Sequence, residues 1–444
     1  MSLATPASVQ KLQAALHAKA KENPAFRFHA LYDKVYRPDV LAQAYACCRA
    51  NKGAAGVDGQ TFADIEAYGV DRWLEELAKE LKEKSYRPQA VKRVWIPKAG
   101  QPAKLRPLGI PTIRDRVAQM SAVLVLTPVF EADLQPEQYA YRAEHRGQDA
   151  VKRVHRLLWQ GYREVVDADL SGYFDSIPHA ELMKCLARRI VDGAMLHLVK
   201  MWLDAPVEET DEQGRRHRTT RNRDDGRGTP QGAVISPLLS NLYMRRFILG
   251  WKTLGYERTL DAHIVNYADD FVICCRDRAE QALAAMTDMM ARLKLTVNPD
   301  KTHVRRVPEE SFDFLGYTFG RCYKPRTGQE YIGTKPSKTR VVRLCRAISE
   351  ATARRGLWRT TAAEVVAGLN RMLDGWSNYF CLGSVGRAYR VVMHHAIRRL
   401  RQWLRAKHKV RGGRQPRWSV AALHADLGLI DLSVKASSFP WAKA

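Results

Sequence analysis

The chain has 444 residues, 45% of them hydrophobic, and a formal charge of +25 from 72 Lys and Arg against 47 Asp and Glu. This composition excludes an intrinsically disordered protein, and the length predicts about three structural units at roughly 150 residues each. The basic excess requires an anionic partner or many counterions, because a surface of one sign repels itself.

The positive charge is concentrated near the C-terminus. Residues 321–444 hold 25 Lys and Arg against 6 Asp and Glu, a net of +19, whereas residues 1–320 hold 47 against 41. The longest nearly apolar stretch, 120–130, is shorter than the ~20 residues of a membrane-spanning helix, and no secretory signal is evident. The eight Cys include no CxxC pair. We therefore expect a cytoplasmic protein without a membrane partner, a disulfide framework or a zinc site.

Hydrophobic periodicity and turn residues predict the secondary structure. Trp73, Leu74, Leu77 and Leu81, for example, recur at helical spacing. In chain order we predict a largely helical 1–50, a loop at 51–64, a helix within 71–86, a basic hairpin at 87–111, a helix at 115–134, a strand at 164–170, a helix from His179, an exposed hairpin or insertion at 207–228, a helix at 239–251, two strands within 263–275, a helix at 278–293, strands at 304–307 and 314–319, a boundary within 320–338 and basic helices after it.

Three carboxylates stand where a predicted strand meets a turn. Asp269 and Asp270 occupy the tip of the segment 263–275, and Asp169 ends the strand 164–170. Adjacent acids raise each other's proton affinity unless a cation lies between them. A single Asp pair in a turn is more often a solvated turn, but the second acidic strand end and the basic hairpin upstream favour a metal site. Two Mg²⁺ ions there could activate a 3′-hydroxyl and brace a leaving pyrophosphate.

The sequence YADD at 267–270 resembles the catalytic box of reverse transcriptases, in the form found in group II intron-encoded proteins. Supporting motifs occur in that family's order, and the resemblance covers nearly the whole chain. These motifs are NKGAAGVDGQTF (51–62), WIPKAGQPAKLRPLGIPTIRDRVAQ (95–119), DADLSGYFDSIPH (167–179), GTPQGAVISPLLSNLYM (228–244), LTVNPDKTHV (295–304), FDFLGYTFG (312–320) and LNRMLDGWSNYF (369–380).

The resemblance implies an α+β right-hand polymerase, with fingers, a palm holding a split antiparallel sheet, and a helical thumb. We expect an N-terminal extension at 1–50 that covers template RNA, reverse transcriptase fingers and palm at 51–320, a thumb or maturase domain at 321–410 and a short basic tail at 411–444. The implied activity is RNA-directed DNA polymerisation, in which deoxynucleotides are added to a primer 3′-hydroxyl, in a bacterial cytoplasm or nucleoid.

The resemblance also assigns roles to residues. Asp169 and Asp269 would bind the metal ions, with Asp270 beside them and the Leu170 carbonyl completing a metal shell; two Mg²⁺ are expected, with Mn²⁺ as the alternative. Phe174 would lie under the incoming sugar and exclude a ribose 2′-hydroxyl. The remaining assignments are Lys92, Lys98 and Arg106 to the nucleotide triphosphate, Gln231 to the nucleotide and template, Arg142 to the template, and Gly316 to the turn that grips the primer.

The basic C-terminal segment is expected to bind RNA. In the run 394–417, Ile397, Leu400 and Leu404 mark one apolar face, and the other faces are almost wholly cationic. Attached to a polymerase, such a helix favours structured intron RNA or template–primer duplex over a membrane or calmodulin. The arginines assigned to RNA are Arg398, Arg399, Arg401 and Arg405, while Trp376 and Phe380 are expected in the thumb core.

The resemblance leaves the biological role open. No Cys follows Cys381 and 27 residues follow Arg417, so we expect no HNH endonuclease domain. The implied partners are an RNA template, a DNA or RNA primer, dNTP and a structured intron RNA, with the oligomeric state undecided. The implied function is polymerisation together with assistance to splicing and retrohoming. The alternatives are a domesticated reverse transcriptase in DNA repair or phage defence, and an RNA-binding splicing cofactor with incidental polymerase activity.

Overall fold

The computed structural model describes residues 5–98, 101–211, 213–324, 327–353, 360–410 and 418–438. The chain divides into two compact units. The first comprises Met1–Arg146, Ala168–Phe271 and Glu280–His303, and the second comprises Gly147–Asp167, Val272–Ala279 and Val304–Ala444. No helix in these described ranges is long and apolar enough to cross a membrane.

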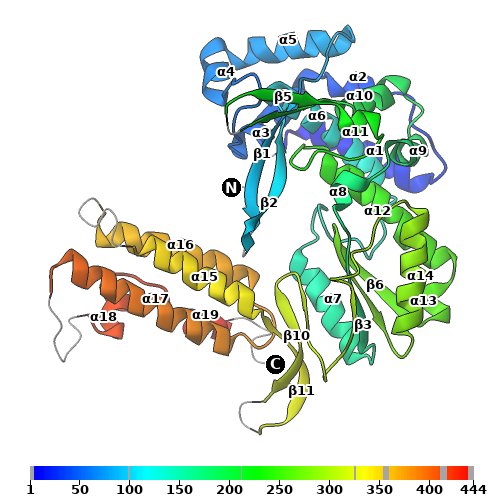
Figure 1. Ribbon diagram of the computed structural model, residues 1–444. Helices are drawn as coiled ribbons and strands as arrows, with labels where there is room; N and C mark the ends of the chain where they lie inside the picture. The colour runs from blue at the N-terminus through cyan, green and yellow to red at the C-terminus, as the bar shows by residue number, and fades with distance from the viewer. Residues whose placement is uncertain are drawn as a thin grey trace. The chain divides into compact units, whose positions relative to one another are not determined.

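The fold is mixed, with helices and mostly antiparallel strands (Figure 1). Its helices and strands are α1 (Ala7–Glu22), α2 (Tyr32–Val35), α3 (Pro38–Ala50), α4 (Phe62–Tyr68), α5 (Val70–Lys82), β1 (Val91–Lys98), β2 (Gln101–Ile110), α6 (Ile113–Glu131), α7 (Gly147–Trp159), β3 (Glu164–Asp169), α8 (Tyr173–Ser176), α9 (His179–Ala187), α10 (Gly193–Leu203), β4 (Val207–Thr210), β5 (Arg216–Thr219), α11 (Arg221–Asp224), α12 (Ser236–Thr253), α13 (Tyr256–Thr259), β6 (Ala262–Tyr267), β7 (Asp270–Cys275), α14 (Ala279–Arg292), β8 (His303–Arg306), β9 (Phe312–Phe314), β10 (Tyr317–Tyr323), β11 (Glu330–Pro336), α15 (Lys338–Ala351), α16 (Ala362–Tyr379), α17 (Gly386–Lys407), α18 (Val420–Ala425) and α19 (Leu432–Ser438).

The first unit is organised around α6, which is apolar on most of its surface and packs against α1 and α3. The fully buried Arg189 holds the end of α1 in place, because its guanidinium donates to the carbonyls of Ala20, Asn23 and Phe26. The N-terminal segment is thus packed into the first unit. Its expected cover over template RNA stays a prediction.

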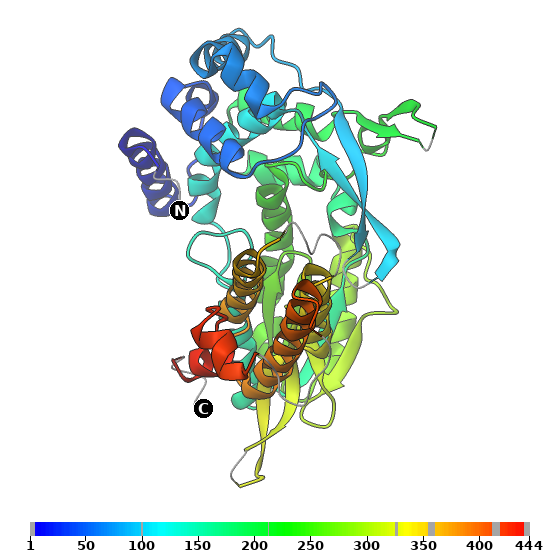
Figure 2. The same cartoon turned by 90° about the vertical axis from the view of Figure 1, so that its left-hand side faces the viewer.

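The predicted basic hairpin forms part of a four-stranded sheet with the order β2-β1-β4-β5. β1 and β2 pair antiparallel, with Ile96 opposite Arg106, and β1 pairs parallel with β4 at Val91 and Val207. The predicted insertion at 207–228 contains β4 and β5, an antiparallel arm that projects from the neighbouring helices (Figure 2).

The strands that carry the predicted carboxylates form a second four-stranded sheet, with the order β6-β7-β3-β8. Val165 and Val166 of β3 and Val265 of β6 are fully buried. Their apolar side chains explain why these short segments form strands, and the polar residues stand where the strands end.

The second unit contains a three-stranded antiparallel sheet with the order β11-β10-β9. The sequence predicted a boundary within 320–338 and helices after it, without further strands. The structure corrects the second point, because β10 continues to Tyr323 and pairs with β11, with Arg321 opposite Ile332. The strand predicted at 314–319 is also interrupted: β9 ends at Phe314, and Leu315 and Gly316 form a turn with positive φ. Gly, Pro and charged residues obscured this hairpin, in which the buried Cys322 of β10 and Ile332 of β11 are ten residues apart in the sequence.

Helices α15, α16 and α17 pack side by side around one hydrophobic cluster. On α17 the buried residues recur every three or four positions and form a continuous stripe: Tyr389, Val392, Met393, Ala396, Leu400, Trp403 and Leu404. Trp376 packs against this cluster and Phe380 is buried, which confirms their expected place in the core.

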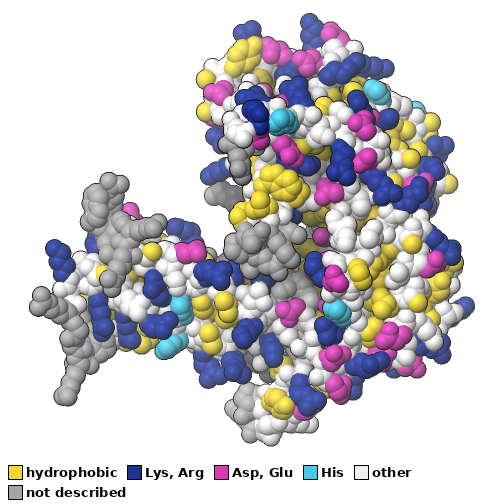
Figure 3. Space-filling model, in the orientation of Figure 1, with side chains coloured by type: hydrophobic (Ala, Val, Ile, Leu, Met, Phe, Trp, Pro, Cys, Tyr) yellow, Lys and Arg dark blue, Asp and Glu magenta, His cyan; other side chains and the backbone are white. Residues whose placement is uncertain are grey.

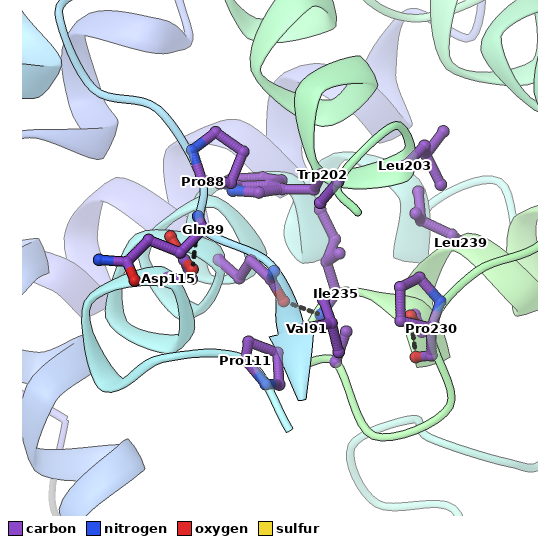
Figure 4. A pocket seen from close by; sticks show the side chains of 14 residues that line it. Pro88, Gln89, Val91, Pro111, Asp115, Trp202, Leu203, Pro230, Ile235 and Leu239 are labelled. Carbon is purple, nitrogen blue, oxygen red and sulfur yellow. Dashed lines mark hydrogen bonds between the residues drawn. The ribbon is translucent and has the colours of Figure 1, made fainter. Parts of the chain in front are cut away.

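A buried polar network anchors the base of the β1–β2 hairpin. Asp115 accepts hydrogen bonds from the Tyr86 hydroxyl (2.6 Å), the Thr112 hydroxyl (2.8 Å) and the Gln89 amide (3.1 Å), and Trp202 Nε1 donates to the Tyr86 oxygen (3.0 Å). Figure 4 shows Asp115, Gln89 and Trp202 around a cavity of about 10 Å³. Burial raises the pKa of the Asp115 carboxyl, and these hydrogen bonds offset part of that rise.

Replacing Tyr86 by Phe should destabilise the protein, because both Asp115 and Trp202 lose a buried partner. We expect the free energy of unfolding to fall by about 1–3 kcal/mol, measured by urea denaturation followed by circular dichroism. Tyr68→Phe is the matched control, since the Tyr68 hydroxyl donates to Glu76 on the surface (2.6 Å) and its loss should cost no more than about 0.5 kcal/mol. Equal losses in the two variants would contradict an anchoring role for the network.

Candidate active site

The YADD segment forms the tight turn between β6 and β7. Ala268 adopts a left-handed backbone with φ +59°, which is strained for a residue with a Cβ atom. The buried Asn266 stabilises this conformation, because its Nδ2 donates to the Ala268 carbonyl (2.8 Å). The turn leaves Asp269 exposed at the tip, while Asp270 is half-buried and begins β7.

Asp169 lies at the end of β3 with 43% of its side chain exposed. One carboxylate oxygen, Oδ2, accepts hydrogen bonds from Lys301 Nζ (3.0 Å) and Asn298 Nδ2 (3.3 Å). The Asp169 carbonyl accepts the Asn298 amide (2.8 Å), and Leu170 forms a β-bridge with Val297. The motif at 295–304 thus surrounds the carboxylate at the end of β3.

The charge of Asp269 also reaches the segment that follows β3. The hydroxyl of Tyr173, four residues after Asp169, is fully buried, and its pKa is raised by burial first and then by Tyr243 and Asp269. Within the described residues, however, no three Asp, Glu, His or Cys side chains converge closely enough to form a ready metal site. The available donors are carboxylate and carbonyl oxygens, which suit Mg²⁺ better than a soft metal.

Strand alternation separates the β1–β2 hairpin into two faces. Lys92, opposite Ile110, and Arg106, opposite Ile96, share one face and are exposed. Lys98 occupies a position of the same parity in β1, but its side chain lies outside the described residues. The hairpin therefore carries Lys92 and Arg106 on the same face, with Arg106 opposite the fourth residue after Lys92.

The loop before α12 packs closely against the hairpin and against the turn after β3. The Thr229 amide donates to the Phe174 carbonyl (2.7 Å), and the Gly109 amide donates to the Gln231 carbonyl (2.5 Å). Gly232 has φ +108°, and a Cβ atom there would collide with the Gly109 carbonyl. Glycine at 232 is therefore required, and three motifs predicted separately meet at this point.

Arg142 is not presented to a ligand in this structure, which departs from its predicted contact with the template. Its side chain is 8% exposed and forms an ion pair with Glu131, with a donor–acceptor distance of 2.5 Å. Its Nη1 also donates to the carbonyls of Gln135 and Gln138 (both 2.8 Å). These contacts give Arg142 a structural role, because they hold the segment 135–138 that precedes it.

Tyr141 is a residue at the site that the sequence did not single out. Gln138 forms a parallel bridge with Asn266, so the segment 138–141 runs beside the end of β6. Tyr141 has φ +57°, and its side chain is 55% exposed. Partial burial raises the Tyr141 pKa, the charge of Asp269 raises it further, and Arg106 lowers it. The only features of the sequence that could have marked Tyr141 as a site residue are its aromatic side chain and its position directly before Arg142.

The predicted RNA-binding residues of the second unit differ in what they contact. Gly316 has φ +81° in the turn before β10, and Arg398 is exposed on α17. Arg399, by contrast, donates to the carbonyls of Ser349 (2.9 Å) and Thr352 (3.2 Å) at the end of α15. Arg401 donates to the Trp418 carbonyl (2.9 Å), and Arg405 is half-buried.

Comparison with known families matches both parts of the chain. The family described as reverse transcriptase (RNA-dependent DNA polymerase) matches residues 96–319, about half of the chain. The family described as group II intron, maturase-specific domain matches residues 342–420. Both matches fall where the motifs predicted a polymerase followed by a thumb or maturase segment.

Curated relatives agree with these families. Protein YkfC of Escherichia coli (strain K12) is 31% identical over 347 residues, which cover 70% of this chain and 87% of YkfC. Group II intron-encoded protein LtrA of Lactococcus lactis subsp. cremoris is 31% identical over 236 residues, which cover 52% of this chain and 37% of LtrA. The polymerase motifs, the maturase-specific segment and these relatives together show that the chain belongs to the group II intron-encoded reverse transcriptases, which are RNA-directed DNA polymerases.

Proposed function

We propose that the chain copies RNA into DNA at Asp169 and Asp269, and that its basic thumb binds the intron RNA whose splicing and retrohoming it assists. The observation that carries the polymerase assignment is the position of the Asp269 turn, which lies beside the segment that follows β3. Asp269 is exposed at the tip of the β6–β7 turn, its charge acts on Tyr173, and Asp169 ends the strand next to β7 in the sheet.

Polymerases of this family use divalent metal ions. In this proposal Asp169, Asp269 and the Leu170 carbonyl hold two Mg²⁺ ions, with Asp270 beside them and Mn²⁺ as the alternative. When bound, the ions would lower the pKa of the primer 3′-hydroxyl and neutralise charge on the leaving pyrophosphate. The oxygen donors fit this group, and the exposure of Asp269 leaves it accessible to the metal and to the primer end.

The hairpin and the turn after β3 hold the nucleotide in this proposal. Arg106 supplies a planar fork for phosphate oxygens, and Lys92 and Lys98 supply point charges. Phe174 is half-buried and excludes a ribose 2′-hydroxyl, so that dNTP is preferred. Gln231 faces the nucleotide and template from the loop packed against Gly109.

Asp269→Ala and Asp169→Ala should each lower the rate of cDNA synthesis by about 10³-fold or more, since metal-ion stabilisation is worth several kcal/mol. The measurement is Mg²⁺-dependent extension of a primer on an RNA template, with RNA affinity measured in parallel and expected to be unchanged. Asp300→Ala, which removes the exposed acid that directly precedes Lys301, is the matched control and should retain synthesis. Synthesis retained in either active-site variant would refute the metal assignment.

Lys301→Met should strengthen metal binding to the free protein, because the Lys301 ammonium competes for Asp169 Oδ2 from 3.0 Å. Both side chains are about half exposed, so we expect the Kd for Mn²⁺ to fall only about fivefold, the equivalent of ~1 kcal/mol. Electron paramagnetic resonance of free Mn²⁺ measures this without polymerisation. Lys301→Arg keeps the positive charge and should leave the Kd unchanged, whereas an unchanged Kd in Lys301→Met would show that the pair does not oppose the metal.

The thumb presents a second stripe on α17, separate from the buried one. Arg387, Arg390, His394 and Arg398 are exposed and recur at helical spacing. Figure 3 shows Lys and Arg side chains over the helical part of the second unit. In this proposal the exposed stripe, together with Arg405, contacts RNA phosphates, whereas Arg399 and Arg401 chiefly hold the helices together.

Replacing Arg387, Arg390 and Arg398 together by Gln should weaken binding to structured RNA and reduce its salt dependence. Each lost phosphate contact lowers the slope of log K against log salt by about 0.7–0.9. The control replaces Arg72, Lys79 and Lys82 on the exposed face of α5, an equal change in charge that should leave the slope nearly unchanged.

Splicing assistance that survives in Asp269→Ala and fails in the thumb variant would separate RNA binding from polymerisation. Equal effects of the two triple variants would contradict the assignment to α17.

A further inference from the structure

Asp175 is an acid that neither the metal site nor the nucleotide-holding hairpin uses. It directly follows Phe174 in the turn after β3, and its Oδ2 accepts a hydrogen bond from Gln231 Nε2 at 2.9 Å. This bond joins two motifs that are 56 residues apart in the sequence. Gln231 is assigned to the nucleotide, and Asp175 is the neighbour of Phe174, which is assigned to the sugar of that nucleotide. The bond therefore connects the two assigned positions.

The backbones on both sides of this bond are fixed. The Thr229 amide donates to the Phe174 carbonyl (2.7 Å), and the Gly228 amide donates to the Ile177 carbonyl (2.9 Å). On the other side of the loop, the Val234 amide donates to Gln119 Oε1 (2.9 Å). Because these contacts hold the backbone, the Gln231 side-chain torsions remain the main freedom at this position, and the bond to Asp175 restricts them.

A cationic residue, Arg93, lies near the Asp175 carboxylate. Asp175 and Arg93 line a cavity of about 520 Å³. Burial raises the pKa of the Asp175 carboxyl, while the Gln231 amide and the Arg93 guanidinium oppose the rise. The Gln231–Asp175 bond lies at an exposed position, and a hydrogen bond to an ionised acceptor is stronger than one between neutral groups.

The bond also fixes which way the amide of Gln231 faces. Only the NH₂ group of an amide can donate to a carboxylate, so the contact with Asp175 determines the position of Oε1. A Gln without this partner could present either its oxygen or its nitrogen to a nucleotide. A carboxylate at 175 removes that ambiguity.

We propose that Asp175 is a positioning residue that orients the Gln231 amide toward the incoming deoxynucleotide and holds it at a fixed distance from Phe174. This inference rests on the proposed function, in which Gln231 contacts the nucleotide and Phe174 excludes the ribose 2′-hydroxyl. Asp175 itself touches neither the nucleotide nor the metal ions. Its loss should therefore affect nucleotide affinity and sugar selection while leaving the chemical step largely intact.

The test is a double-mutant cycle on the full chain with Asp175→Ala, Gln231→Ala and the double variant. Primer extension on an RNA template gives KM and kcat for dNTP, and the ratio of dNTP to rNTP incorporation. Asp175→Ala should raise the KM about tenfold, as expected for one hydrogen bond to a charged group, with kcat changed less than about threefold. It should also lower the ratio of dNTP to rNTP incorporation. The double variant should be no worse than Gln231→Ala.

Two further variants separate positioning from a general loss of structure. Asp175→Asn keeps an oxygen that accepts from Gln231 Nε2, so the KM should recover to within about threefold of the original protein. Asp225→Ala removes an acid from the wall of the same cavity, where it pairs with Arg221 (3.1 Å) and does not contact Gln231. Its KM should be unchanged.

Several outcomes would overturn the inference. Additive effects of Asp175→Ala and Gln231→Ala would show that the two side chains act independently, and an unchanged KM in either single variant would show that the bond does not serve the nucleotide. A fall in kcat alone, or failure of Asp175→Asn to restore KM, would indicate a different role. Failure of the proposed function is distinct, since it would appear as synthesis retained in Asp269→Ala.

Discussion

The burial of apolar residues along β3 and β6, which leaves the acids that follow them at the surface, is the constraint on which the candidate site depends. Asp169 follows the buried Ala168, and Asp269 follows the buried Ala268, so the apolar backing of both strands holds their carboxylates at the surface. Moving either carboxylate inward would be costly, because an unpaired buried charge is strongly disfavoured. In the free chain the Lys301 ammonium, 3.0 Å from Asp169 Oδ2, supplies a cation beside this carboxylate.

The close packing around Gln231 follows from a different constraint, the need to bring three chain segments within hydrogen-bonding distance. Gly109 and Gly232 allow the hairpin and the loop to approach where a side chain would collide. The backbone bonds then leave only side-chain freedom, which Asp175 restricts through Gln231. Backbone contacts determine how closely the hairpin and the loop approach each other. The hydrogen bond to the Asp175 carboxylate determines the orientation of the Gln231 amide.

Local patterns in the sequence predicted the elements and the carboxylates, because strand ends, turns and helical stripes leave a signature within about ten residues. The hairpin that carries Asp269 and the helix with Trp73 and Leu77 are examples, and both form as predicted. Partners that are distant in the chain left no such signature. Arg142 pairs with Glu131, Asp175 with Gln231 and Asp169 with Lys301, and these pairs are 11, 56 and 132 residues apart.

The same distinction, between local sequence patterns and contacts with distant residues, explains why the arginines of the thumb differ in their roles. Residue type alone made every arginine between 398 and 405 equally suited to RNA, but helix geometry divides them by the direction in which each points. Arg398 lies on the exposed stripe, whereas Arg399 reaches the carbonyls that end α15, where a cation is favoured by the helix dipole. Part of the basic excess of the C-terminal segment therefore stabilises the helices themselves. The charge available to an RNA partner is the exposed share, and its helical spacing on α17 sets where phosphates can bind.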